Sequence, residues 1–360
     1  GILGRLVEFP VIRLVSALGN RFKFIRRGIV NVESRLYPGR MYDEYFERYA
    51  PRLLITSSLG YMIDPYFMRA ARRYKCKVVS IIHGWDNTST KDYRGADPDY
   101  VITWNDIMKS EVNVFHDIPK ESIHTGGIAH WDHYFSENLK FREKEEFLKT
   151  NELSQDRRVI FYATSNATKN PRSLDVVELI LKGIRSDRIR YPAQLLVRLH
   201  PLYLLKSKKP DNGRVIDQYK TRMTSLKNEY GELVSFRLPS VELLEDDIDM
   251  PVEDMITLAE TYHYSDVLIN EYSTVTFEAA IFDLPIVNAA LYNYRNTTRP
   301  AAFEENLTHV KRMLQYGATR NAYSVDELYD NINCYLEDPS LDGHGRRKLI
   351  DCEIPYRRGC

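Results

Sequence analysis

Four short polar clusters, each following an apolar run, hold the side chains with which this chain could do chemistry. They occupy residues 83–91, 164–169, 200–201 and 271–274. The apolar runs before them are typical of buried parallel strands. In open parallel sheets, ligands bind beyond the carboxyl ends of the strands. The pattern therefore predicts that the clusters line the binding edges of two sheets, in a cleft between two domains.

Residues 265–288 show this arrangement most fully. An apolar run at 267–269 precedes Ser273 and Thr274, and a helical stretch at 275–282 follows them. A helix N-terminus presents unpaired backbone N–H groups and the positive end of its dipole, and two hydroxyls add further donors. We therefore expect a nucleotide phosphate at Ser273 and Thr274. Glu278, on the same helix, either accepts hydrogen bonds from ribose hydroxyls or lies on the surface.

The other two clusters of the second half could add contacts to the phosphate. His200 follows an apolar run and is fixed by Pro201, so its imidazole could donate to a phosphate leaving group. Arg198 alternates with the apolar residues of that run and faces either the ligand or a salt bridge. Ser165 and Asn166 could also donate to phosphate, although loops of this composition occur without any ligand.

In the first half, the cluster at 83–91 offers a candidate base. His83 ends an apolar run, and an imidazole at such a strand end can act as a general base at neutral pH. Asp86 either orients this histidine or is itself the base. Trp85 either stacks on a substrate ring or packs in the core. Asn87 and Lys91 complete the set that we assign to acceptor binding.

Composition and charge restrict the class of partner. The chain has 360 residues, which suggests two domains, and it is 43% hydrophobic and 28% charged. Fifty basic residues balance fifty acidic ones, so no overall field attracts nucleic acid. No apolar run reaches the roughly 18 residues of a transmembrane helix. The four cysteines show neither a disulfide framework nor metal-ligand spacing, which favours a reducing cytoplasm.

No motif indicates a metal or an organic cofactor. Asp97-Pro98-Asp99 is typical of a turn before a strand, and Asp247-Ile248-Asp249 lies in an acidic loop. The glycine patterns of dinucleotide-binding and P-loop proteins do not occur, and neither does the G-x-S-x-G of serine hydrolases. We therefore expect neither a metal nor a cofactor.

Strand and helix patterns alternate in two successive series, as in chains that build parallel α/β sheets. A charged helical stretch and a polar stretch end the first series, at residues 141–158. We therefore expect an N-terminal acceptor domain with N-terminal helices at residues 1–150 and a C-terminal nucleotide-donor domain at 151–335. A helical tail at 336–360 could cross back to the first domain.

The first 30 residues combine helical spacing of apolar residues with basic ones. The apolar positions are Leu6, Phe9, Ile12, Val15, Leu18, Phe22 and Ile25. Two interpretations remain open. The helix could pack its apolar side on the first domain, or it could lie on a membrane surface as a basic amphipathic helix.

With these motifs the chain resembles glycosyltransferases of the GT-B architecture. It is most similar to the CDP-glycerol glycerophosphotransferases of teichoic acid synthesis and to bacterial sialyl- and Kdo-transferases. The matching features are His83-Gly84, His200-Pro201, the segment 266–274 and the Gly-rich turn at 126–132, and the resemblance spans roughly residues 50–290. The chain departs from the pattern in its Ser-Thr pair, where Ser-Ser is usual, and in Glu271, where Asp or Asn is common.

The resemblance implies two Rossmann-like domains whose parallel sheets face each other across a cleft. It also implies an inverting, metal-independent transfer from a nucleotide-activated donor, often CMP- or CDP-linked, to a cell-surface glycan or lipid-linked acceptor. By this resemblance His83 is the base, with Asp86 as its competitor, while His200, Ser273 and Thr274 hold the phosphate. Two rivals stay open: a non-hydrolysing sugar-nucleotide 2-epimerase, and a catalytically silent nucleotide-sugar-binding protein.

Overall fold

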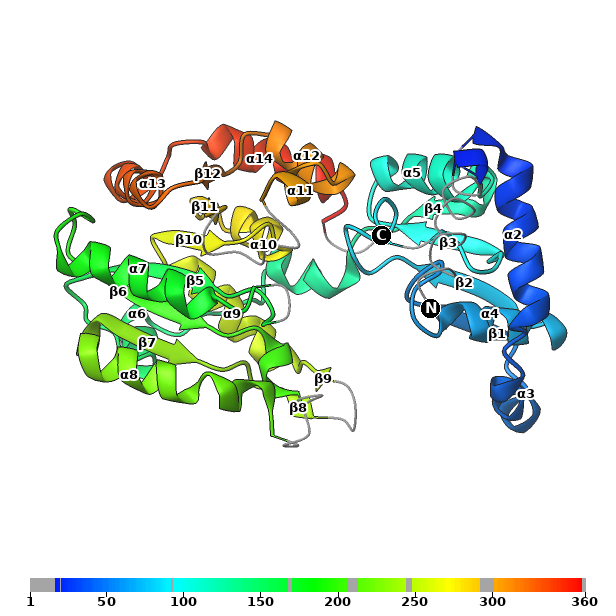
Figure 1. Cartoon of the computed structure of the whole chain (residues 1–360), viewed down its shortest axis with the longest axis horizontal. Helices are drawn as coiled ribbons and strands as arrows, with labels where there is room; N and C mark the ends of the chain where they lie inside the picture. Colours follow the sequence, from blue (N-terminus) through cyan, green and yellow to red (C-terminus); the bar gives the residue numbers. More distant parts are fainter. Residues whose placement is uncertain are drawn as a thin grey trace, which may run out of the picture. The chain divides into compact units, whose positions relative to one another are not determined.

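The chain divides into two compact units, each built around its own parallel sheet (Figure 1). The computed structural model describes residues 17–19, 21–91, 93–167, 170–205, 213–243, 248–291 and 301–357. The first unit comprises residues 1–129 and 353–360, and the second comprises residues 130–352. This confirms the predicted α/β class with two Rossmann-like domains. The predicted cleft, with the two sheets facing each other, stays a prediction.

The first unit holds a four-stranded parallel sheet in the order β1-β2-β3-β4. Its strands are β1 (Leu53–Thr56), β2 (Lys77–Ile81), β3 (Tyr100–Thr103) and β4 (Ile123–Thr125). Its helices are α2 (Lys23–Leu36), η1 (Arg40–Tyr42), α3 (Asp43–Tyr49), α4 (Asp64–Arg73), α5 (Asp106–His116) and η2 (Lys120–Ser122). Strand patterns in the sequence at residues 53–55, 77–82 and 99–103 predicted the first three strands. β4 was not predicted, because three residues with a central histidine give no apolar run.

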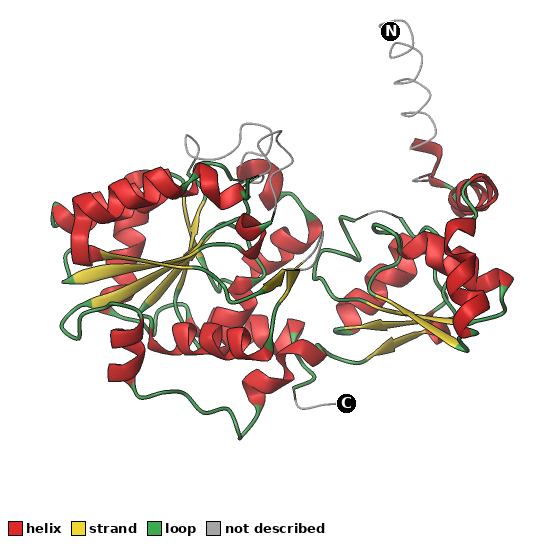
Figure 2. Cartoon of the chain, turned by 90° about the horizontal axis from the view of Figure 1, so that it is seen from below, coloured by secondary structure: helices red, strands yellow, loops and turns green. Residues whose placement is uncertain are grey.

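The described helices of this unit cover one face of the first sheet (Figure 2). On the covered face, α4 and α5 pack against alternate residues such as Val78 and Val101, which are buried. The opposite face leaves four large apolar side chains exposed, namely Leu53, Ile55, Ile81 and Tyr100. Parallel sheets are usually covered on both faces, so this bare face is an unusual feature of the described first unit.

The second unit holds a six-stranded parallel sheet in the order β12-β11-β10-β5-β6-β7. Its strands are β5 (Arg158–Ala163), β6 (Ala193–Arg198), β7 (Val234–Arg237), β10 (Val267–Asn270), β11 (Ile286–Ala289) and β12 (Arg320–Ala322), and β8 (Glu242–Leu243) pairs separately with β9 (Ile248–Asp249). The longer helices are α6 (Lys144–Thr150), α7 (Ser173–Arg185), α8 (Lys220–Tyr230), α9 (Val252–Tyr264), α10 (Val275–Ile281), α12 (Thr308–Gln315), α13 (Val325–Glu337) and α14 (Gly343–Glu353). The short ones are η3 (Ala129–Phe135), η4 (Pro201–Leu204), η5 (Val215–Gln218), η6 (Gly231–Leu233) and α11 (Ala301–Glu305).

The strand order of the second sheet reverses between β5 and β10. From β5 the chain adds β6 and β7 on one side, and then returns to add β10, β11 and β12 on the other side. Adjacent strands whose connections leave in opposite directions open a crevice at their carboxyl ends, which is where doubly wound folds bind ligands. The residues that directly follow these two strands are therefore the prime candidates for a binding site.

The boundary between the units falls at residues 129 and 130, before the predicted boundary at 150. The intervening segment packs on α9 of the second unit. Arg142 makes an ion pair with Glu260 (2.5 Å), and the Phe147 and Tyr264 rings lie 5.1 Å apart. The predicted tail at 336–360 also divides between the units. All of α14 except its last residue lies in the second unit, and the residues from 353 onward lie in the first. There the Asn105 amide donates to the backbone carbonyl of Glu353 (2.9 Å).

Candidate functional site

The carboxyl edge of the second sheet gathers three of the four polar clusters. Ser165 follows β5, His200 follows β6, and Ser273 and Thr274 follow β10. All six strands are parallel, so the three loops leave the sheet at the same edge, with the β5 loop in the middle. Two of these loops flank the point where the strand order reverses. Residues 168 and 169 of the predicted 164–169 cluster lie outside the described residues.

The His200 ring is oriented by bonds to its own loop and to the β5 loop. The His200 backbone N–H donates to the Thr164 hydroxyl (3.0 Å), and the Leu202 N–H donates to the His200 Nδ1 (3.2 Å). A nitrogen that accepts a hydrogen bond carries no proton, so in the neutral ring the proton lies on Nε2. His200 thus presents an N–H donor, as a contact with a phosphate oxygen requires.

Ser273 and Thr274 lie at a sharp turn between β10 and α10. Tyr272, just before them, has a left-handed backbone (φ 52°), which non-glycine residues rarely adopt outside turns or functional sites. Thr274 is the N-cap residue of α10, as the sequence allowed, but its side chain makes no capping hydrogen bond. Both residues are half-buried. The turn therefore presents two hydroxyls at the edge of the sheet, and capping does not engage the Thr274 hydroxyl.

Buried acceptor atoms lie beside this turn. The Tyr162 hydroxyl of β5 donates to Glu271 Oε1 (2.6 Å) and so links the two strands of the reversal point. Glu271 is only 1% exposed, and its Oε2 has no hydrogen-bond partner among the described residues. The Asn270 Oδ1 is likewise buried and lacks a partner there. Buried acceptors are nearly always paired, so these two atoms are exceptions within the described part of the turn.

Glu278 is not the surface residue that one of its two predicted roles describes, and its contact with ribose hydroxyls stays a prediction. It is 9% exposed and not on the surface, and its Oε2 accepts a hydrogen bond from the Tyr134 hydroxyl (2.7 Å). Burial raises the pKa of Glu278 to about 7, although Tyr134 and the nearby Arg198 oppose the shift. Arg198 itself makes a buried ion pair with Asp254 (2.5 Å). Arg198 was predicted to face either the ligand or a salt bridge, and the structure shows the salt bridge.

We expect Glu278→Gln to change how stability depends on pH. With a folded pKa of about 7 against an ordinary pKa of 4.5, the native state binds the Glu278 proton more tightly than the unfolded chain does. Stability is therefore lost as pH rises from 4.5 to 7, by an amount on the order of 3 kcal/mol. Glutamine lacks this titration, so the variant should unfold at a higher temperature than the wild type at pH 8 and not at pH 4.5.

The comparison must be made as a difference between variant and wild type, because another buried group titrates in the opposite sense. Burial lowers the pKa of His116 to about 4, so its contribution to stability grows between pH 4 and 6.5. His116 is present in both proteins and cancels in the difference. Equal unfolding temperatures at pH 8 would show that Glu278 has no raised pKa.

In the first unit, His83 lies at the carboxyl end of β2 with an exposed ring. Its Nδ1 lies 2.8 Å from the backbone carbonyl oxygen of Ser57, which can only accept. Nδ1 therefore carries the proton, and the basic lone pair of the neutral ring is on Nε2. The Ser57 loop is held in turn by Asp64, whose carboxylate accepts from the Ser57 N–H (3.2 Å) and the Ser58 hydroxyl (2.8 Å). This support fixes the ring of a general base, and the sequence did not reveal it.

The neighbours of His83 differ in how well they fit their predicted roles. Trp85 is buried at 6% exposure, which favours packing over stacking on a substrate ring. Asn87 is also 6% exposed, so it presents little surface to an acceptor. Asp86 makes an ion pair with Lys91 (3.3 Å), and the Lys91 ammonium lies 5.0 Å from the centre of the Tyr61 ring.

The structure therefore forms two separate groups from the predicted site residues. Ser165, His200, Ser273 and Thr274 share one edge of the second sheet, while His83, Asp86 and Lys91 lie together in the first unit. Tyr134 and Tyr162 were missed. Their contacts join segments far apart in the chain, and no local pattern marks them. Among the described residues, no group of three or more His, Cys, Asp or Glu side chains could hold a metal ion.

These features define a two-domain α/β protein with the GT-B fold, and solved structures of that fold resemble it at low sequence identity. A wall teichoic acid polymerase TagF variant shares 12% identity with a TM-score of 0.52, covering 86% of this chain and 69% of TagF. The UDP-GlcNAc 2-epimerase of Methanocaldococcus jannaschii, in complex with UDP-GlcNAc and UDP, shares 12% identity with a TM-score of 0.53, covering 87% and 78%.

A third structural relative is a glycosyltransferase from Rickettsia africae. It shares 12% identity with a TM-score of 0.50, and the match covers 88% of this chain and 76% of that one. No protein-family model matches the sequence, and no curated protein matches it either. At such identities the likeness shows the fold alone, and it includes both transferases and epimerases.

Proposed function

We propose that this protein is an inverting, metal-independent glycosyltransferase, or a transferase of the glycerophosphotransferase type. It would move a group from a nucleotide-activated donor, CMP- or CDP-linked by the motif resemblance, to a glycan or lipid-linked acceptor of the cell surface. One observation carries the proposal: Ser273, Thr274 and the Nε2–H of His200 share the carboxyl edge of the second sheet, beside the point where its strand order reverses. Fold relatives solved with UDP and UDP-GlcNAc support a nucleotide-activated donor.

In this mechanism the two histidines perform opposite tasks. The Nε2 lone pair of His83 takes the proton of the acceptor hydroxyl, and the resulting oxygen attacks the donor on the side away from the nucleotide. The bond to the nucleotide phosphate breaks, and the Nε2–H of His200 with the hydroxyls of Ser273 and Thr274 stabilises the departing charge. Hydrogen-bond donors that are already positioned where negative charge develops contribute strongly to the rate. Attack on the side of the carbon opposite the leaving nucleotide inverts the configuration of that carbon.

The two rival functions use the same fold differently. A 2-epimerase would interconvert a nucleotide sugar with no acceptor present, and a binding protein would show no turnover at all. The oriented basic nitrogen of His83 favours an enzyme over a binding protein, because a structural histidine has no need of a free basic lone pair. With its proton on Nδ1, His83 keeps a basic Nε2 and suits the role of general base. With its proton on Nε2, His200 suits the role of a donor to phosphate.

The test is to supply nucleotide-activated donors with and without acceptor. A thermal-shift series with CMP, CDP, UDP, GDP and ADP first identifies the nucleotide, because a ligand of the native state stabilises it by mass action. We expect release of that nucleotide only when an acceptor polyol or glycan is added. Conversion of a UDP-sugar to its 2-epimer without acceptor would establish the epimerase instead. Binding without any product would favour the silent protein.

We expect the activity to survive EDTA. In the part of the chain that the structure describes, no acidic cluster accompanies the phosphate-binding candidates, and the Asp97 carboxylate pairs with Arg94 (3.0 Å) and Arg72 (3.4 Å). Initial rates with and without EDTA should agree within error. A loss that magnesium or manganese restores would mean that a metal bound to the donor phosphates takes part in the reaction.

A further inference from the structure

Helix α2 of the first unit turns its apolar side toward solvent. Ile25, Ile29, Val32 and Leu36 recur at the spacing that places residues on one side of a helix. Ile29 is 43% exposed, Val32 55% and Leu36 68%. An amphipathic helix normally buries this stripe in its own domain, as one interpretation of the sequence expected. Here the stripe has no such cover among the described residues.

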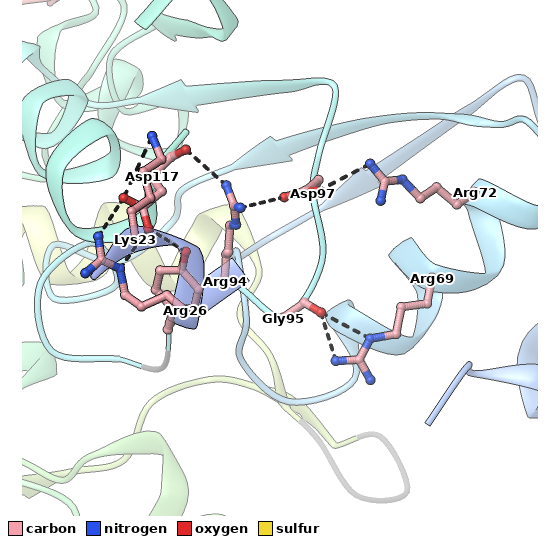
Figure 3. Close-up of polar contacts among 9 residues, drawn as sticks. Lys23, Arg26, Arg69, Arg72, Arg94, Gly95, Asp97 and Asp117 are labelled. Atoms are coloured by element: carbon pink, nitrogen blue, oxygen red, sulfur yellow. Dashed lines mark hydrogen bonds and ion pairs between the residues drawn. The ribbon is translucent and has the colours of Figure 1, made fainter. Parts of the chain in front are cut away.

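Polar contacts hold the adjoining side of α2, about 100° round the helix from the stripe, to the unit (Figure 3). The Arg26 guanidinium donates through Nε and Nη2 to the two carboxylate oxygens of Asp117, each at 2.7 Å. Glu33 pairs with Arg69 (2.8 Å). Arg69 also donates to the Gly95 carbonyl (2.8 Å), as Figure 3 shows. Only Val30 of the α2 apolar residues is buried. The orientation of the helix is thus set by ion pairs, and it leaves the apolar stripe outside.

The charges on and near the stripe are mainly positive. Residues 21–36 contain five basic side chains and one acidic side chain, Glu33, which Arg69 neutralises. Arg21, Arg27 and Arg35 are exposed. Just beyond the helix, Met41 (73%) and Tyr49 (64%) are exposed as well. No helix in the described ranges is long and apolar enough to span a membrane.

We propose that α2 docks the first unit on an anionic membrane surface. The stripe of Ile25, Ile29, Val32 and Leu36 enters the region between headgroups and acyl chains, while the arginines contact lipid phosphates. The positive charge of α2 favours an anionic lipid surface over a second copy of the chain as the partner of this stripe. A second copy of the chain would bring two strongly positive helices together, whereas anionic lipids neutralise them. The inference is independent of the proposed transferase function, because it uses only contacts within the first unit.

The experiment is co-sedimentation of the full chain with two kinds of vesicle, phosphatidylcholine alone and an equal mixture of phosphatidylcholine and phosphatidylglycerol. We expect binding to the mixed vesicles, falling as salt is raised, and little binding to phosphatidylcholine. Ile29→Ser combined with Val32→Ser should lower the partition constant by about 10-fold or more, through lost apolar burial. Arg21→Gln combined with Arg35→Gln should lower it by about 5-fold per charge on mixed vesicles only.

The matched control removes two exposed apolar side chains elsewhere in the same unit. Ile55→Ser combined with Ile81→Ser, on the bare face of the first sheet, should leave vesicle binding unchanged. Equal loss in this control, or equal binding of the wild type to both vesicle types, overturns the proposal. So does a wild-type dimer that the α2 substitutions dissociate in light scattering. The arginine pair tests the proposal even if the serine pair impairs folding.

Discussion

Replacing His83 with alanine is expected to lower kcat by about 100-fold or more, the scale of lost general base catalysis, while the affinity for nucleotide stays nearly unchanged. The reason is that the basic Nε2 of this ring is oriented by the Nδ1–H bond to the Ser57 carbonyl oxygen. Steady-state kinetics of acceptor turnover, with nucleotide binding measured separately, check this result. His83→Gln should be equally impaired, because an amide cannot accept the proton.

Asp86→Asn is the control for the identity of the base. The Asp86 carboxylate makes an ion pair with Lys91, so its loss should cost far less than the loss of His83. A larger loss of kcat for Asp86→Asn than for His83→Ala would make the carboxylate the base. A bell-shaped pH profile that keeps its acidic limb in His83→Ala would give the same answer.

His200→Ala should weaken nucleotide binding as well as slow turnover. A hydrogen bond to a charged group contributes about 1.5–3 kcal/mol, which corresponds to roughly 10- to 150-fold in affinity. Isothermal titration with the nucleotide identified by thermal shift measures the change. His200→Gln keeps an N–H donor and should recover part of the affinity. Full affinity in His200→Ala would show that the imidazole does not contact the phosphate.

Thr164→Val separates direct contact from positioning. The Thr164 hydroxyl accepts the His200 backbone N–H (3.0 Å) but is itself buried at 6% exposure. Its loss should loosen the loop and reduce affinity less than His200→Ala does. Identical losses in the two variants would mean that the loop conformation, and not the ring, determines binding.

The sequence predicted the elements that follow from local patterns. The runs at 159–163 and 267–269 form β5 and β10, which are fully buried except at Arg158, because apolar residues without alternation suit strands covered on both faces. The pattern of Ser324 followed three residues later by Glu327 is typical of a capped helix start. Ser324 does cap α13, with its hydroxyl accepting the Glu327 N–H (3.2 Å). These features depend on neighbours a few residues away, so they can be derived without knowing the fold.

Features that depend on distant partners could not be derived in this way. Glu278 is typical of an exposed helical residue by its local pattern, yet Tyr134 buries and binds it. Arg198 had two open roles, and only the fold brings Asp254 to it. The sequence also could not show that the apolar stripe of α2 faces outward. Ion pairs with Asp117 and Arg69 determine which side of the helix faces the unit.

The most direct test of the account is hydrogen–deuterium exchange with and without saturating nucleotide, since the central claim is where the nucleotide binds. We predict slower exchange in the loops at residues 164–167, 199–205 and 270–277, at the carboxyl edge of the second sheet. The loops at 56–64 and 83–91 of the first unit should remain unchanged, because they are assigned to the acceptor. Protection confined to those first-unit loops, or to neither set, would contradict the account.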